Sequence, residues 1–280
     1  MINGENIIYH YIQKTLLSDT ENNDFNKKLI ERLIVDLSIW IPKNVYQQLP
    51  ILLPFVVRDA SCRKKQPDTG KHEWGFANNE GFLRDDNSLI KGIIKPLYVE
   101  GKRVKEYDNK KLGKGFVASH IWRKLQNGET RLASNLPITN SFIPNLVWLP
   151  KQISKLTDRE GSYAQKILKV LSYKIYFDEN FQNELYRDVW SYLDNPEDEI
   201  NLAVDTSKLN YFITPQSWID KKKNDLIGEI NRIIKTLEEN KPADKKVKCS
   251  SYLPTLLNRI ENDNKQRFID WLNKYKKIIE

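Results

Sequence analysis

The chain has 280 residues, of which 40% are hydrophobic, 29% charged and 11% aromatic. This is the composition of an ordinary globular protein, long enough to bury a core without disulfides or structural metals, and it excludes a disordered or fibrous chain. A formal net charge of +8, from 45 basic and 37 acidic residues, favours polyanionic partners, with nucleic acid first.

Cysteine usage and apolar segments narrow the class of protein further. Cys62 and Cys249 stand far apart without a CxxC motif, which argues against a cysteine-built zinc site and fits a reducing compartment. The first ten residues lack the basic and apolar regions of a secretory signal. The longest apolar stretches, such as residues 52–57, are too short to span a bilayer. We therefore expect a cytoplasmic protein that makes no membrane contact.

The N-terminal hundred residues predict a mixed structure. Two helices are expected over residues 5–40, and in the second one Leu29, Leu33 and Leu37 keep a helical spacing. Residues 89–99 are apolar and partly β-branched, which predicts strands on either side of a break at Lys95-Pro96.

Alternating and helical patterns follow in the rest of the chain. Strands are predicted over residues 115–122 and 142–149, and a helix over 158–177. An apolar stripe from Trp218 to Leu237 and a terminal helical pair complete the pattern. The sequence thus predicts an α+β fold in three consecutive parts: a helical or mixed part over 1–100, a part with two strands and a helix over 101–178 and a helical part over 179–280.

Of the three histidines, His120 has the most informative surroundings. His10 falls in an amphipathic helix and His72 in a polar turn. His120 closes the strand predicted over 115–122, a polar loop follows, and Asn145 opens the second strand. A predicted helix comes next, so the order is strand with histidine, loop, asparagine with strand, helix.

This order resembles the ββα-metal module of HNH nucleases. The resembling residues are Ser119-His120-Ile121 and Asn145-Leu146-Val147-Trp148-Leu149-Pro150. The resemblance implies that His120 is the general base that activates water against a phosphodiester, and that Asn145 either orients this histidine or helps to hold a divalent metal ion. It further implies a metal-dependent DNA endonuclease with a ββα core over 101–178 and Mg²⁺ or another divalent ion. About 200 residues lie outside this core and leave room for sequence recognition, which we expect from residues 1–100, so a type II restriction enzyme is the expected kind.

The same resemblance suggests metal ligands. The family often places ligands nine and thirteen residues after the asparagine, where this chain has Ser154 and Asp158. A spacing of four puts both on one face of a helix, and Asp158 offers the hard oxygen that Mg²⁺ prefers. The residue before the histidine is usually Asp or His, whereas here it is Ser119, and the last histidine of the family name is absent. We expect Asn145, Asp158 and Ser119 as the metal set.

Two other functions remain open. Asp86 precedes an apolar stretch that ends with Glu100-Gly101-Lys102, a pattern similar to that of PD-(D/E)xK nucleases, in which carboxylates hold Mg²⁺ and the lysine assists the attacking water. The other possibility is a DNA-binding protein without catalysis.

Basic residues flank the candidate centre along the chain. A phosphate backbone would contact such residues, and double-stranded DNA is therefore the expected partner. The candidates are Arg63, Lys64, Lys65, Lys110, Lys111, Lys114, Arg123 and Lys124. One centre cuts one strand, so we expect a homodimer for a double-strand break.

Overall fold

The computed structural model describes nine stretches of the chain, which are residues 24–59, 64–65, 67–70, 72–73, 78–84, 88–178, 183–196, 200–240 and 260–280. The chain divides into two compact units, and each is assembled from three separated segments. Unit 1 comprises residues 1–43, 94–130 and 144–213, and unit 2 comprises residues 44–93, 131–143 and 214–280. Both units therefore draw on all three of the consecutive parts expected from the sequence.

Unit 1 is built on a six-stranded mixed sheet with the strand order β7-β6-β10-β1-β9-β8. The central strands β10 and β1 are parallel, and the other neighbours are antiparallel. In chain order the strands are β1 (Ile39–Trp40), β6 (Tyr98–Glu100), β7 (Lys110–Lys111), β8 (Phe116–His120), β9 (Leu146–Pro150) and β10 (Asn210–Ile213).

The connection between the two edge strands shows that this sheet is curled. β7 and β8 lie at opposite edges, and a flat sheet of six strands would separate them by about 24 Å. Only residues 112–115 connect them, and this stretch bridges at most about 18 Å between Lys111 and Phe116. The ring of Tyr107, three residues before β7, lies 5.7 Å from the ring of Phe116 in β8. The sheet must therefore bend so that its edges approach each other.

Helices cover the sheet of unit 1, and α7 (Tyr163–Tyr176) supplies much of its core. The others are α2 (Asp24–Leu37), α6 (Lys151–Ser154) and α8 (Glu184–Ser191), with 3₁₀ turns at η2 (Lys105–Tyr107), η5 (Lys155–Thr157) and η6 (Thr206–Lys208). The side-chain hydroxyl of Ser162 caps α7 by accepting a hydrogen bond from the backbone N–H of Gln165 at 3.2 Å. Gly161, directly before this cap, has a φ of +73°, and the chain turns there before the helix begins. The helix expected over 158–177 is therefore confirmed from Tyr163 onwards, whereas residues 158–162 form a turn.

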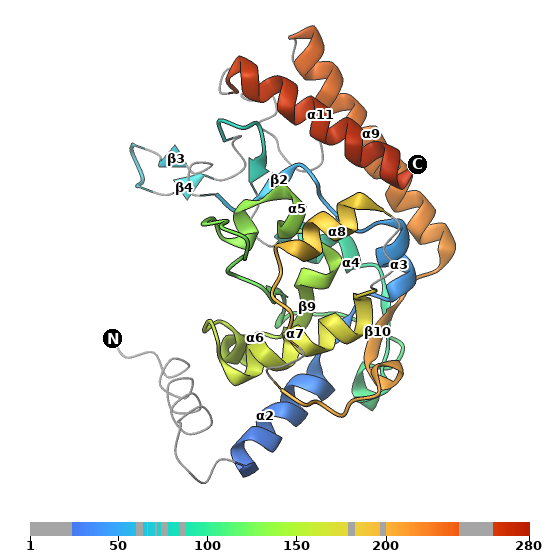
Figure 1. Cartoon of the computed structure of the whole chain (residues 1–280). Coiled ribbons are helices and arrows are strands. Elements are labelled where there is room, and N and C mark those ends of the chain that lie inside the picture. Colours follow the sequence, from blue (N-terminus) through green and yellow to red (C-terminus); the bar gives the residue numbers. More distant parts are fainter. Residues whose placement is uncertain are drawn as a thin grey trace. The chain divides into compact units, whose positions relative to one another are not determined.

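Unit 2 is mainly helical. Its elements are α3 (Lys43–Gln48), α4 (Ser88–Ile94), α5 (Pro137–Asn140), α9 (Gln216–Glu239), α11 (Asn262–Ile279), the short strands β2 (Val56–Val57), β3 (Lys64–Lys65), β4 (His72–Glu73) and β5 (Leu83–Arg84), and the 3₁₀ turn η3 (Ala133–Asn135); η4 (Ile143–Asn145) falls where the chain passes to unit 1. Helices α9 and α11 run side by side (Figure 1). Ile230 and Ile233 of α9 are buried, which confirms the apolar stripe expected from Trp218 to Leu237, and Phe268 and Leu272 are buried in α11. The other helix of the expected terminal pair lies outside the described residues.

Two local predictions were wrong. Ser88–Ile94 is a helix rather than a strand, because Leu89, Ile90, Ile93 and Ile94 also fit helical spacing and a short apolar run does not distinguish the two. The second helix expected over residues 5–40 ends at Leu37 in α2, and Ile39–Trp40 forms the strand β1.

The chain is nevertheless an α+β protein, as expected. In the part of the chain that the structure describes, no helix combines the length and apolarity needed to cross a bilayer.

Candidate functional site

His120 is the last residue of β8, at the edge of the sheet of unit 1. Strands β8 and β9 are antiparallel, with Phe116 opposite Pro150 and His120 opposite Leu146. Helix α6 begins directly after β9 at Lys151. The order of strand, loop, strand and helix expected from the sequence is therefore present, and the His120 side chain is half-buried at the end of its strand.

Asn145 fixes the main chain that follows the histidine. Its side chain is 0% exposed, and its Oδ1 accepts from the backbone N–H of Ile121 at 3.0 Å and of Trp122 at 2.7 Å. The Ile121 N–H also points to the Asn145 carbonyl oxygen at 3.0 Å. Since an amide oxygen has two lone pairs, the N–H groups of Ile121 and Trp122 together occupy both acceptor positions of Asn145 Oδ1. The geometry favours the orienting role of Asn145 over the metal-binding one.

The other two expected metal ligands, Ser119 and Asp158, differ from Asn145 in orientation and in partners. Ser119 is 9% exposed and pairs with Val147, and strand alternation turns its side chain to the face opposite His120. The carboxylate of Asp158 is 56% exposed and forms an ion pair with Lys155 at 3.6 Å.

The helical spacing assumed for Ser154 and Asp158 is also absent. Helix α6 ends at Ser154 and the 3₁₀ turn η5 follows, so the two residues do not share one α-helical face. Ser154 is buried, and its hydroxyl donates to the Lys151 carbonyl at 2.9 Å. Among the described residues, no three His, Cys, Asp or Glu side chains gather to hold a metal ion. The set of Asn145, Asp158 and Ser119 does not fit a metal ion in this geometry.

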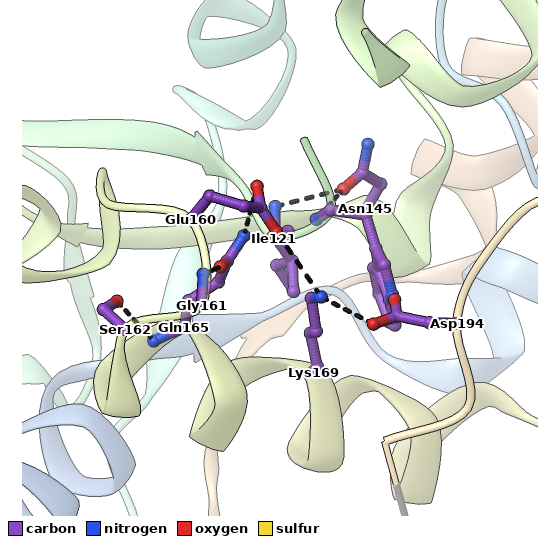
Figure 2. Close-up of polar contacts among 9 residues, drawn as sticks. Ile121, Asn145, Glu160, Gly161, Ser162, Gln165, Lys169 and Asp194 are labelled. Carbon is purple, nitrogen blue, oxygen red and sulfur yellow. Dashed lines mark hydrogen bonds and ion pairs between the residues drawn. The ribbon is translucent and has the colours of Figure 1, made fainter. Parts of the chain in front are cut away.

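A buried polar network from α7 reaches the same loop (Figure 2). Gln165 is 0% exposed, and its Nε2 donates to the Ile121 carbonyl at 2.9 Å. One turn later, Lys169 pairs with Asp194 at 2.7 Å and with Glu160 at 3.7 Å. These residues were not predicted from the sequence. A glutamine and a lysine on the apolar stripe of a helix could have indicated them, because such polar residues are seldom buried without partners.

Five of the eight basic candidates belong to the unit that holds His120. Lys110 and Lys111 form β7, Lys114 lies shortly before β8, and all three are exposed. Arg123 and Lys124 are exposed just after His120, and the Arg123 guanidinium donates to the Asp158 carbonyl. Of the remaining three, Arg63 lies outside the described residues, and the other two, Lys64 and Lys65, form β3 of unit 2.

The pair proposed for the rival centre lies on another strand of unit 1. Glu100 ends β6, and its carboxylate is 3.3 Å from the Lys102 ammonium, with both side chains about half exposed. Lys102 also donates to the Ser207 carbonyl at 3.2 Å. Asp86 lies outside the described residues. Exposed ion pairs of this kind are common on protein surfaces and contribute little on their own.

Comparisons with protein-family models, with curated proteins and with solved structures gave no match for this chain.

Proposed function

We propose that this protein is a DNA endonuclease of the HNH type, similar in role to a type II restriction enzyme, with His120 as its general base. The observation that carries the proposal is the main chain around His120. The histidine ends β8, and the buried amide of Asn145 holds the next two backbone N–H groups. A base held on a fixed backbone keeps its distance to the attacking water, which is a major source of catalytic rate.

The proposed reaction is hydrolysis of a phosphodiester bond. The imidazole of His120 takes a proton from water as the water oxygen bonds to phosphorus, and the bond from phosphorus to the leaving oxygen breaks. The leaving oxygen is then protonated by solvent. Arg123 and Lys124 follow the histidine in sequence and are exposed, so their positive charges favour binding of the phosphate beside it.

The need for a divalent ion is part of the proposal, although the expected ligand set does not fit one. Mg²⁺ in nucleotide-processing enzymes is commonly bound through one or two carboxylates together with substrate phosphates. We expect EDTA to abolish plasmid cleavage and added Mg²⁺ to restore it. Since Asp158 is paired with Lys155, Asp158→Ala should leave the Mg²⁺ concentration for half-maximal cleavage unchanged. A strongly raised Mg²⁺ requirement in Asp158→Ala would return this residue to the metal site.

DNA binding is expected to depend on salt through the exposed cations of unit 1. Each phosphate contact contributes a slope of about −0.9 to log affinity against log salt, because bound counterions are released. Lys114→Ala or Lys124→Ala should each make the slope less negative by about one if its lysine contacts a phosphate. Fluorescence anisotropy with a labelled duplex between about 50 and 200 mM salt measures this.

The matched control lies in the other unit. Lys221 is exposed in α9, and Lys221→Ala should leave the salt slope unchanged. If the salt slope changed in Lys221→Ala but in neither Lys114→Ala nor Lys124→Ala, the DNA-binding surface would not be at the β8 edge.

Two comparisons separate the competing functions. A DNA-binding protein without catalysis would bind duplex DNA and leave plasmid intact at every Mg²⁺ concentration. A centre of the PD-(D/E)xK kind would lose cleavage in Glu100→Ala or Lys102→Ala while DNA affinity was kept, and His120→Ala would then cut normally. We propose that a homodimer makes the double-strand break, one subunit cutting each strand. At low protein concentration, where the dimer dissociates, we expect nicked plasmid to accumulate before linear plasmid.

A further inference from the structure

Gln165 is a buried amide whose polar atoms are all engaged. Its Nε2 donates to the Ile121 carbonyl at 2.9 Å and to Glu160 Oε2 at 3.3 Å, and its Oε1 accepts from the Gly161 N–H at 2.7 Å. The amide can be placed in one way only, because its nitrogen faces two acceptors and its oxygen faces a donor. Such a group is costly to bury unless each of these bonds is made.

Ile121, the residue directly after His120, is held from two sides (Figure 2). Its N–H is bonded to Asn145 and its carbonyl to Gln165. The first bond comes from Asn145, the last residue of η4 directly before β9, and the second comes from α7, so two elements distant in the sequence fix one residue. We propose that Gln165 is a positioning residue for His120, an inference that rests on the proposed function.

Lys169 and its two carboxylate partners hold Gln165 in this orientation. Lys169 is buried, and its ammonium lies 2.7 Å from Asp194 and 3.7 Å from Glu160. The same Glu160 carboxylate accepts from Gln165 through its second oxygen. A buried ammonium requires such partners, because an unpaired charge in the interior is strongly unfavourable. Glu160 is thus kept beside the Gln165 amide and cannot turn freely into solvent.

The first test removes the hydrogen bonds of Gln165 and keeps its length. We expect Gln165→Met to fold and to bind duplex DNA with wild-type affinity, while the single-turnover rate of cleavage falls by roughly 10²-fold, the usual effect of a misplacement of about 1 Å. Thr157→Val is the matched control, since Thr157 is 2% exposed and its hydroxyl donates to the carbonyl of Ser154, the last residue of α6. It should cleave at the wild-type rate. A wild-type rate in Gln165→Met would overturn the proposal.

The second test asks whether Gln165 acts through His120. In a double-mutant cycle, Gln165→Met should cause no further loss of cleavage rate when it is added to His120→Ala, because the group that it positions is already absent. A general effect on folding or on DNA binding would instead lower the rate by the same factor in both backgrounds, and that result would also refute the positioning role.

A third variant keeps the inference testable if Gln165→Met does not fold. Glu160→Ala removes the second acceptor of the amide from a partly exposed position, with an expected loss of about tenfold in rate. If it cut at the wild-type rate, the inference would fail. The proposed function fails separately, if His120→Ala itself cuts normally. A loss in His120→Ala without a loss in the Gln165 or Glu160 variants would reject the inference alone.

Discussion

His120→Ala is expected to lower the single-turnover rate of DNA cleavage by about 10²–10⁴-fold, the usual contribution of a general base. Duplex affinity should be kept, because the exposed cations of unit 1 remain in place. Plasmid cleavage under excess protein measures the rate, and anisotropy measures the affinity. This variant has the largest expected effect because it removes the group that takes the proton from water.

His72→Ala is the matched histidine control. His72 belongs to β4 of unit 2, whereas β8 and β9 belong to unit 1, so we expect this variant to cleave as the wild type does. If His120→Ala kept wild-type cleavage, the proposal of an HNH-type endonuclease would be rejected. Equal losses in the two histidine variants would indicate a general effect of losing a histidine rather than the role of a base.

Asn145→Ala should destabilise the fold and slow cleavage together. Its Oδ1 is the acceptor for two backbone N–H groups, those of Ile121 and Trp122, at a fully buried position. The Ile121 N–H keeps the Asn145 carbonyl oxygen as a partner, whereas the Trp122 N–H loses its acceptor. Leaving one buried donor without a partner costs about 1–3 kcal/mol, and we expect the free energy of unfolding to fall by that amount. The rate should fall by about 10²-fold, because the backbone after His120 loses its fixed position. Urea unfolding and single-turnover cleavage measure the two effects.

Asn140→Ala separates stability from catalysis. Asn140 is equally buried and donates to the Val56 carbonyl at 2.9 Å, but both residues belong to unit 2. It should lose stability and retain the cleavage rate under conditions where the protein stays folded. If Asn145→Ala behaved in the same way, the asparagine would be a structural residue without influence on the histidine.

The local order of the candidate site was predictable from the sequence. Alternating apolar residues and turn signals placed strands close to β8 and β9, and a helical stripe placed α7. The central strands β1 and β10 were not predicted, because one has two residues and the other four. Elements this short owe their conformation to their neighbours in the sheet rather than to their own pattern.

The sequence by itself placed His120 at the end of a strand and Asn145 at the start of the next, since strand periodicity and turn residues act over a few positions. It did not show that the Asn145 amide faces the peptides after His120, nor that Gln165, 44 positions beyond Ile121, bonds to the same residue. The sequence also did not show that a 3₁₀ turn follows Ser154, so that Asp158 and Ser154 do not share one face of an α-helix. These features depend on which buried polar groups meet across elements far apart in the chain. Only the folded arrangement fixes those partners, because each must be satisfied within the core.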